Sequence, residues 1–254
     1  GAEFPRGVFF IAHGCQHQGT DIFSDVGHDG WRFAECAQSN FGKCLGLPEE
    51  VRLREAARVR GYVVMAVSGG RGLKSCWNMD RDVARVNAAI RHVKAAEGLR
   101  EDAAVLAYGA SSGGAFVGRL AAPISKGGVP HLHCIVPEIM AVHGAPNRGV
   151  PALFVHMPRD QRTAAAVSTD MAALRKQGVR VSEIEVNPRP LTADFLAPCL
   201  TEELASEAMQ ALRSDGLLDE AGYLKRDARE RQWVPTLVDV LSGKGVQDSL
   251  MPDE

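Results

Sequence analysis

A glycine-flanked serine, set between an apolar run and a helical pattern, constrains this chain more than any other feature. The apolar run begins at Val105, the turn at residues 109–113 reads Gly-Ala-Ser-Ser-Gly, and a helical pattern continues from Phe116. Glycine on either side of Ser111 leaves room for a tight backbone turn, so we predict strand, sharp turn and helix, with the serine hydroxyl above a sheet. The alternative is a glycine-rich turn of any open sheet.

Apolar runs that predict buried strands alternate with amphipathic helical patterns along the chain. Strands are expected at residues 8–12, 62–67, 103–108, 132–136, 152–156 and 179–186. Helices are expected after Leu47, across 83–93, and from a cap at Thr163 to Gly178. This alternation predicts an α/β fold with a mostly parallel sheet of about six strands and helices on both faces.

The 254 residues contain no linker rich in Pro, Gly or Ser, so we expect a single domain over residues 1–254. The connection at 137–150 is too short for a cap domain, and residues 201–254 are expected to form a helical tail. The segment 13–47 shows no clear periodicity. Long loops of this kind tend to be functional, and this one would leave the carboxyl edge of the sheet.

Charge and hydropathy argue against two classes of partner. Lys and Arg total 29 against 31 for Asp and Glu, which lacks the basic excess of a nucleic-acid binder. No apolar run approaches the length of a membrane span. We therefore expect a small-molecule partner, no nucleic acid and no membrane span.

The chain contains six cysteines, which is many for an ordinary domain. Cys134 lies in an apolar run and is expected to be a buried small hydrophobe. For the loop cysteines we expect disulfides, Cys36 with Cys44 or Cys15 with Cys76, which would suit a secretory or organellar compartment. Because no close Cys-x-x-Cys pair occurs, we expect no metal, and no cofactor is predicted.

Three motifs, in this chain order, resemble the α/β-hydrolase superfamily. They are the His13-Gly14 pair after the first strand, the serine turn at 109–113, and His156-Met-Pro-Arg-Asp160 after the fifth strand. The chain is most similar to the small, capless esterase and dienelactone-hydrolase-like branch. The resemblance implies a single-domain α/β-hydrolase fold without a cap domain.

The resemblance also implies roles for residues around the serine. Ser111 matches the nucleophile, which needs a nearby base and donors for the oxyanion that forms. The backbone N–H of Ser112 matches one oxyanion donor, and that of Gly14 or Cys15 matches the second. His13 is expected to hold its loop by hydrogen bonds and to play no catalytic part.

Asp160 matches the acid of the family, the residue that orients the catalytic histidine. A helix cap or a surface ion pair is the alternative role for this carboxylate. Glu138, at the end of the fourth strand, is a second candidate for the acid.

The chain departs from the family pattern at the base. The family's histidine follows the last strand, but no histidine occurs after His156 in this sequence. Three alternatives follow: a histidine from another loop serves as base, the enzyme is slow, or the site only binds. For a substitute base we expect His143 first, with His17 and His28 behind it.

The sequence therefore predicts a serine-hydrolase-like enzyme that acts on a carboxylic ester or related acyl substrate. Aromatic side chains near the sheet edge would suit an apolar substrate, and those expected to bind it are Trp31, Phe33 and Trp77. The alternative is a catalytically impaired protein of the same fold that binds a small apolar ligand or partner. A dinucleotide-binding fold is disfavoured, because the glycine spacing is not Gly-x-Gly-x-x-Gly.

Overall fold

The structure, a computed structural model, divides the chain into two compact units, Gly1–Val186 and Asn187–Glu254. Its described residues are 5–23, 46–69, 76–196 and 200–242. We expected a single domain with a tail from residue 201. The second unit begins earlier than that tail, at Asn187.

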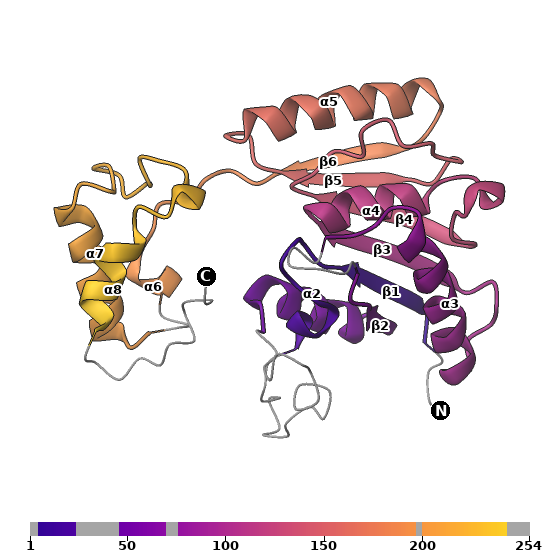
Figure 1. The fold of residues 1–254 in the computed structure, drawn as a ribbon, viewed down its shortest axis with the longest axis horizontal. Coiled ribbons are helices and arrows are strands. Elements are labelled where there is room, and N and C mark those ends of the chain that lie inside the picture. Colours follow the sequence, from indigo (N-terminus) through magenta and orange to yellow (C-terminus); the bar gives the residue numbers. More distant parts are fainter. Residues whose placement is uncertain (1–4, 24–45, 70–75, 197–199, 243–254) are drawn as a thin grey trace. The chain divides into compact units, whose positions relative to one another are not determined.

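Six parallel strands form one sheet in the first unit, in the order β2-β1-β3-β4-β5-β6 (Figure 1). Their bounds are Gly7–Ala12 for β1, Tyr62–Ala66 for β2, Ala104–Ala110 for β3, Leu132–Glu138 for β4, Ala152–His156 for β5 and Val181–Glu185 for β6. The predicted α/β class and parallel sheet are confirmed. In the register, Ala12 lies beside Gly109, so the loop that follows β1 emerges next to the serine turn.

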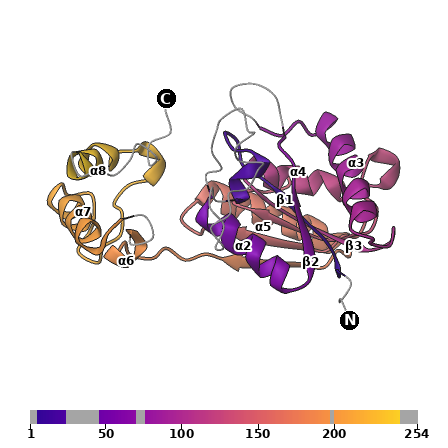
Figure 2. The same cartoon turned by 90° about the horizontal axis from the view of Figure 1, so that it is seen from below.

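Helices cover both faces of this sheet, as predicted. Three of them share one core with the sheet: α3 (Arg81–Ala96), α4 (Ser112–Leu120) and α5 (Gln161–Lys176). The other face carries α2 (Pro48–Val59) and the 3₁₀ helix η1 (Gly19–Ile22), with a second cluster around Ile11 and Tyr108. Figure 2 shows α2 on the opposite side of the sheet from α3 and α4.

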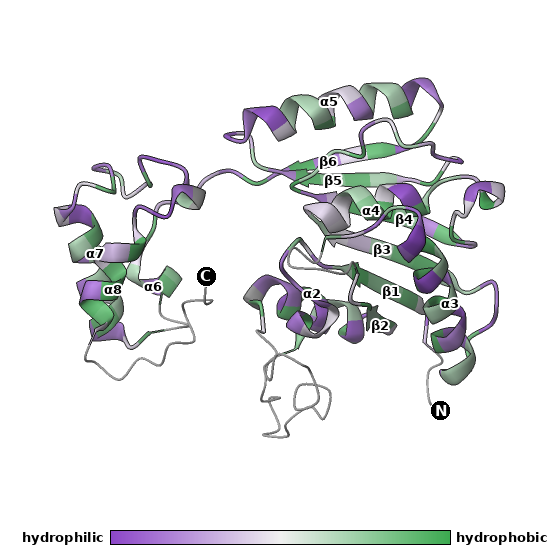
Figure 3. Ribbon diagram, viewed as in Figure 1, coloured by the Kyte–Doolittle hydropathy of each residue, from purple (hydrophilic) through white to green (hydrophobic). Residues whose placement is uncertain are grey.

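Strand composition explains why both faces are covered. Phe10 is fully buried against the first helical layer, while its neighbour Ile11 is buried against the second. The strands β1, β2 and β5 are mostly hydrophobic (green) in Figure 3. Near-continuous apolar strands of this kind are typical of parallel sheets that are buried on both sides.

Two helix starts show how local sequence fixes the ends of elements. Pro48 occupies the first turn of α2, where its missing N–H costs nothing. We expected Thr163 to cap α5, but the cap is Asp160, whose Oδ1 accepts from the Thr163 N–H at 3.2 Å. The carboxylate begins the helix one turn earlier than the hydroxyl would, because it reaches the free N–H groups of the first turn.

The second unit is helical and has a small core of its own. Its elements are α6 (Ala193–Leu196), α7 (Glu202–Ser214), η3 (Ala228–Glu230) and α8 (Val234–Leu241). Thr201 caps α7 by accepting from the Leu204 N–H at 3.3 Å. Met209, Leu212 and Leu218 form its buried centre. Among the described residues, no helix is long and apolar enough to cross a membrane.

Candidate active site

Ser111 lies at the turn between β3 and α4 with a strained backbone, φ 52° and ψ −118°. Such a conformation costs free energy for a residue with a Cβ, and it persists where the surroundings enforce it. Here two close approaches do so: a Cβ on Gly109 would lie 2.2 Å from Gly113 O, and one on Gly113 would lie 2.1 Å from Ala12 O. The predicted strand, sharp turn and helix are therefore present, and both glycines are required by space.

The start of α4 supplies backbone donors next to this serine. Ser112 is the first residue of α4, so its N–H belongs to the free N–H groups at the positive end of the helix. The loop after β1 comes close as well: the position of a Cβ on Gly14 would lie 3.8 Å from both Ala110 O and Ser111 Cβ. The structure thus brings Gly14 beside Ser111, as an oxyanion loop requires.

His13 fastens this loop from inside the protein. Gly69 N–H donates to His13 Nε2 at 2.9 Å, so Nδ1 carries the proton and donates to Gly14 O at 2.6 Å. Burial lowers the pKa of His13, which keeps its ring neutral. The Trp77 ring lies tilted beside the imidazole, with ring centroids 5.1 Å apart, and its Nε1 donates to His13 O at 2.9 Å. Both ring nitrogens are thereby engaged, and the structural role expected of His13 agrees with these contacts.

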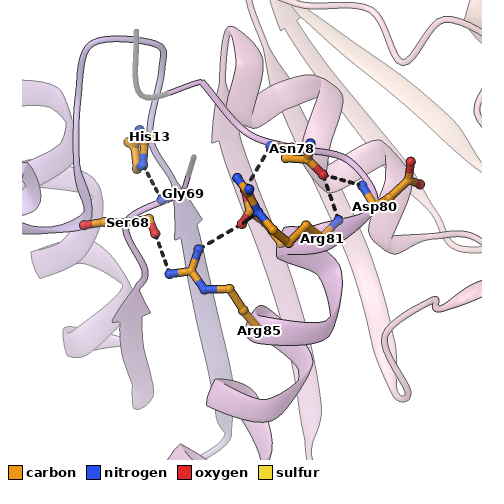
Figure 4. A network of polar contacts seen from close by, with 8 residues as sticks. His13, Ser68, Gly69, Asn78, Asp80, Arg81 and Arg85 are labelled. Carbon is orange, nitrogen blue, oxygen red and sulfur yellow. Dashed lines mark hydrogen bonds and ion pairs between the residues drawn. The ribbon is translucent and has the colours of Figure 1, made fainter. Parts of the chain in front are cut away.

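A polar network joins the loop after β2 to the first turns of α3, as Figure 4 shows. Arg85 donates to Ser68 O at 3.1 Å and to the Asp82 carboxylate at 2.8 Å. Asp82 is fully buried and also accepts from the Asn78 N–H at 2.9 Å. Ser68 in turn accepts from the Gly19 N–H at 3.0 Å. The ends of β2 and α3 are therefore tied to the loop that passes Ser111.

A disulfide joins Cys15 to Cys76, one of the two pairings expected from the sequence. It links the residue after Gly14 to the segment before α3. Cys36 and Cys44 lie outside the described residues, so the other expected pairing stays a prediction. Cys134 is a free, half-buried cysteine of β4, and burial raises the pKa of its thiol.

A histidine and a carboxylate lie on the same loop, beyond Gly14. His17 Nδ1 is 3.2 Å from Asp21 Oδ2, and this hydrogen bond raises the pKa of His17. His17 is about one-third exposed, whereas the Asp21 side chain is 3% exposed. The Gly14 Cβ position that lies beside Ser111 would also lie 3.6 Å from His17 Cδ2. The imidazole and the serine therefore border the same small space.

Glu138, the second acid candidate, ends β4 beside the serine turn. Its backbone carbonyl accepts from the Ser111 N–H at 3.0 Å, and its carboxylate accepts from the Tyr108 hydroxyl. Burial, with the nearby charges of Glu50 and Glu49, raises the pKa of Glu138 to about 6. The side chain thus titrates close to neutral pH at the edge of the site.

Asp160 and His143, expected first as acid and base, both make local contacts in the structure. Besides its bond to the Thr163 N–H, Asp160 Oδ2 accepts from the Thr163 hydroxyl at 2.9 Å, which is the helix-cap role weighed from the sequence. The His143 side chain is exposed in the loop after β4, and the backbone N–H of His143 donates to Asp170 Oδ2 at 2.8 Å. His156 is buried, with Nε2 3.1 Å from Glu183 Oε2.

Of the three aromatic side chains expected to bind substrate, the structure describes Trp77. Trp77 is 5% exposed and stacks on Phe116 with ring centroids 4.1 Å apart, so it belongs to the core and not to a substrate-binding rim. Trp31 and Phe33 lie outside the described residues, as does His28. Their proposed roles stay predictions.

Sequence reasoning missed Asp21. The signal was present, because a carboxylate four residues after His17, directly past the His13-Gly14 pair, can reach its imidazole if the segment turns like a helix. Without knowledge of the η1 turn, nothing in the residue types ranked this pair above the other histidines.

No family model matches the chain, and no curated protein matches it. Solved structures with a similar arrangement include an acylaminoacyl peptidase from Pyrococcus horikoshii (12% identity, 73% of this chain and 33% of that one, TM-score 0.44) and a Pyrobaculum calidifontis esterase (14%, 84% and 77%, 0.46). A third is MGS-M1, an α/β hydrolase from a deep-sea metagenome (15%, 93% and 85%, 0.45). The chain spans only 33% to 48% of the first such structures.

The fold class rests on the architecture itself. Six parallel strands in the order β2-β1-β3-β4-β5-β6 carry a strained serine at the turn from β3 into α4, with the loop after β1 beside it. This is the α/β-hydrolase fold, as the sequence motifs implied.

Proposed function

We propose that the chain is a serine hydrolase that cleaves carboxylic esters or related acyl compounds through an acyl intermediate on Ser111. The observation that carries the proposal is the backbone of Ser111, held at φ 52° between Gly109 and Gly113 at the start of α4. Strained non-glycine residues of this kind cluster at functional sites, and a strained turn between strand and helix is how a nucleophilic serine is exposed at the edge of a sheet.

The surroundings supply donors for the charge that acyl transfer creates. The N–H of Ser112 lies at a helix N-terminus, and the N–H groups of Gly14 and Cys15 come from the loop against Ser111. Donors fixed before the reaction stabilise a developing oxyanion without reorganisation, and each such donor contributes about 100-fold or more in rate.

A fluorophosphonate probe tests this proposal, because it labels serines whose hydroxyl is activated. We expect the wild type to be labelled and Ser111→Ala to lose labelling. Ser125→Ala, in the exposed turn at Ile124–Lys126, is the matched control and should label like the wild type. Equal labelling of the wild type and Ser111→Ala would refute the assignment.

The second candidate is a binding protein with the same fold and no turnover. The observation in its favour is the absence of any histidine after His156 in this sequence. A wild type that binds apolar esters without hydrolysing them, and resists the probe, would favour this alternative.

A further inference from the structure

The position of the general base is the open question that the family pattern leaves in this chain. We infer that His17 is the base for Ser111 and that Asp21 orients it, so that a complete Ser-His-Asp set is built from one short loop and one turn. This inference rests on the proposed function, since it needs Ser111 to be a nucleophile.

The side chains of His17 and Ser111 border the same space beside Gly14. The space left open by the missing side chain of Gly14 is bordered by Ser111 Cβ at 3.8 Å and by His17 Cδ2 at 3.6 Å. Cδ2 is bonded to Nε2, the ring nitrogen that does not contact Asp21. The edge of the imidazole that includes Nε2 therefore borders the same space as the Ser111 side chain.

The contact with Asp21 sets the tautomer of His17. A carboxylate accepts but does not donate, so the contact of 3.2 Å from Asp21 Oδ2 places the proton of neutral His17 on Nδ1. Nε2 then has a free lone pair and can accept the serine proton. Asp21 acts as a positioning residue, which fixes the ring and stabilises the imidazolium that forms.

The carboxylate of Asp21 is buried, which is costly for a charged group. The side chain is 3% exposed, and Oδ1 is buried without a hydrogen-bond partner among the described residues. Keeping a carboxylate in such a place costs free energy that a polar turn at the surface would avoid. The Gln18 N–H, at 3.0 Å, and His17 share Oδ2, so the burial serves to hold the imidazole.

The loop that carries the pair is fastened at several points. The Gly19 N–H bonds Ser68 Oγ at 3.0 Å, the Asp21 carbonyl accepts from the Leu47 N–H at 3.0 Å, and Cys15 is disulfide-bonded. Residues held in this way keep the distance and orientation between a base and a nucleophile constant, on which general-base catalysis depends.

The proton balance of the reaction follows from this arrangement. Ser111 Oγ attacks the acyl carbon while its proton passes to His17 Nε2, and the carbonyl oxygen becomes an oxyanion beside the Ser112 N–H. The C–O bond to the leaving alcohol then breaks, and His17 gives that proton to the departing oxygen. A water molecule, deprotonated by His17, attacks the acyl carbon, and the proton returns to Ser111 as the acid leaves.

The charged groups around His17 set the pH at which it can act. Asp21 raises the pKa of His17 above 6.5, and Glu50 of α2 adds to this, while His13 on the same loop is a neutral neighbour. Glu138 at the end of β4 is a further carboxylate close to Glu50. Because only neutral His17 accepts a proton, the rate should fall as the pH drops through this raised pKa.

The test measures the rate of fluorophosphonate labelling for a set of histidine variants in the full chain. His17→Gln should slow labelling by about 100-fold or more. His143→Gln tests the first choice from the sequence, and His92→Gln, on the exposed face of α3, is the matched control that should behave as the wild type. Far-UV circular dichroism checks that each variant is folded.

Two further measurements separate a base from a structural histidine. Added imidazole should restore part of the labelling of His17→Ala but not of Ser111→Ala. Asp21→Asn removes the main cause of the raised pKa of His17, so the acid limb of its pH profile should move to lower pH. A merely structural pair would give neither rescue nor a shifted limb.

The outcomes of the inference and of the proposed function differ. A wild type without labelling contradicts the proposed function. If the wild type is labelled through Ser111 but His17→Gln reacts at the wild-type rate, the inference is wrong, and a loss in His143→Gln would assign the base there. Gly14→Ala keeps the inference falsifiable if His17 variants fail to fold, because its methyl would enter the space that both side chains border. Unchanged labelling of that variant would overturn the inference.

Discussion

The sulfur atoms of Cys15 and Cys76 are bonded, which closes a loop between residues 61 positions apart and ties the residue after Gly14 to the segment before α3. A cross-link of this span restricts the unfolded chain more than the folded one. The same bond holds the loop that carries His17 and the N–H groups of Gly14 and Cys15, the proposed oxyanion donors.

We predict that the double variant Cys15→Ser, Cys76→Ser is less stable by about 4 kcal/mol on the chain-entropy account of disulfides. Urea unfolding under non-reducing conditions measures the change. Labelling of Ser111 should also slow, because the loop is released. An unchanged unfolding midpoint and unchanged labelling would show that the bond constrains neither the fold nor the site.

Asp170 offers a second stability test. This buried carboxylate accepts from the N–H groups of Val142, His143 and Gly144 at 2.7, 2.8 and 3.0 Å. Asp170→Ala leaves three donors without this acceptor and should cost about 3 kcal/mol or more in the free energy of unfolding. Asp170→Asn keeps one carbonyl oxygen and should lose less, so equal losses in the two variants would contradict this account.

The two glycines of the site should respond differently to the same change. Gly113→Ala places a methyl 2.1 Å from Ala12 O, so we expect the chain not to fold. Gly14→Ala meets no atom nearer than 3.6 Å, so it should fold with a near-native melting temperature. Its labelling rate should nevertheless drop by about 100-fold, as expected for misplaced reacting groups.

Glu138 should make stability depend on pH. Its folded pKa of about 6 is above the ordinary value of 4.5, so the folded state binds more protons between these values. The stability that this group contributes is present below pH 4.5 and is lost as the pH rises through 6. Glu138→Gln should therefore stabilise the protein at pH 7.5 by up to about 2 kcal/mol and change little at pH 4.

Urea unfolding at the two pH values checks this prediction. Glu97→Gln, at an exposed glutamate directly after α3, is the control and should not reproduce the gain at pH 7.5. The same loss of stability with rising pH in wild type and Glu138→Gln would assign the effect to another group.

Much of the first unit could be predicted from local patterns. Continuous apolar runs predict every strand of the sheet, and the run at 152–156 has the observed bounds of β5. The serine turn could be predicted because glycine at 109 and 113 indicates a backbone turn with no room for a side chain at either position. These features depend on neighbours in the sequence, which is why residue type and spacing suffice.

The side-chain roles were harder to predict because they depend on distant contacts. Trp77 looks like a loop aromatic, yet Phe10 and Phe116, far away in the sequence, bury it. Asp160 has the position of a catalytic acid, but a carboxylate before a helix serves equally as a cap. His17 ranked behind His143 because the approach of Gly14 to Ser111 joins two segments almost one hundred positions apart, as the β1–β3 register shows.

The proposed mechanism requires that Ser111 carries the acyl group during turnover. The most direct measurement is mass spectrometry of the full chain, quenched with acid during hydrolysis of p-nitrophenyl acetate and then digested to peptides. We predict one acetyl group on the peptide that contains Ser111, and none on that peptide in Ser111→Ala. An acetyl group on another residue during turnover, or hydrolysis that persists in Ser111→Ala, would contradict the account.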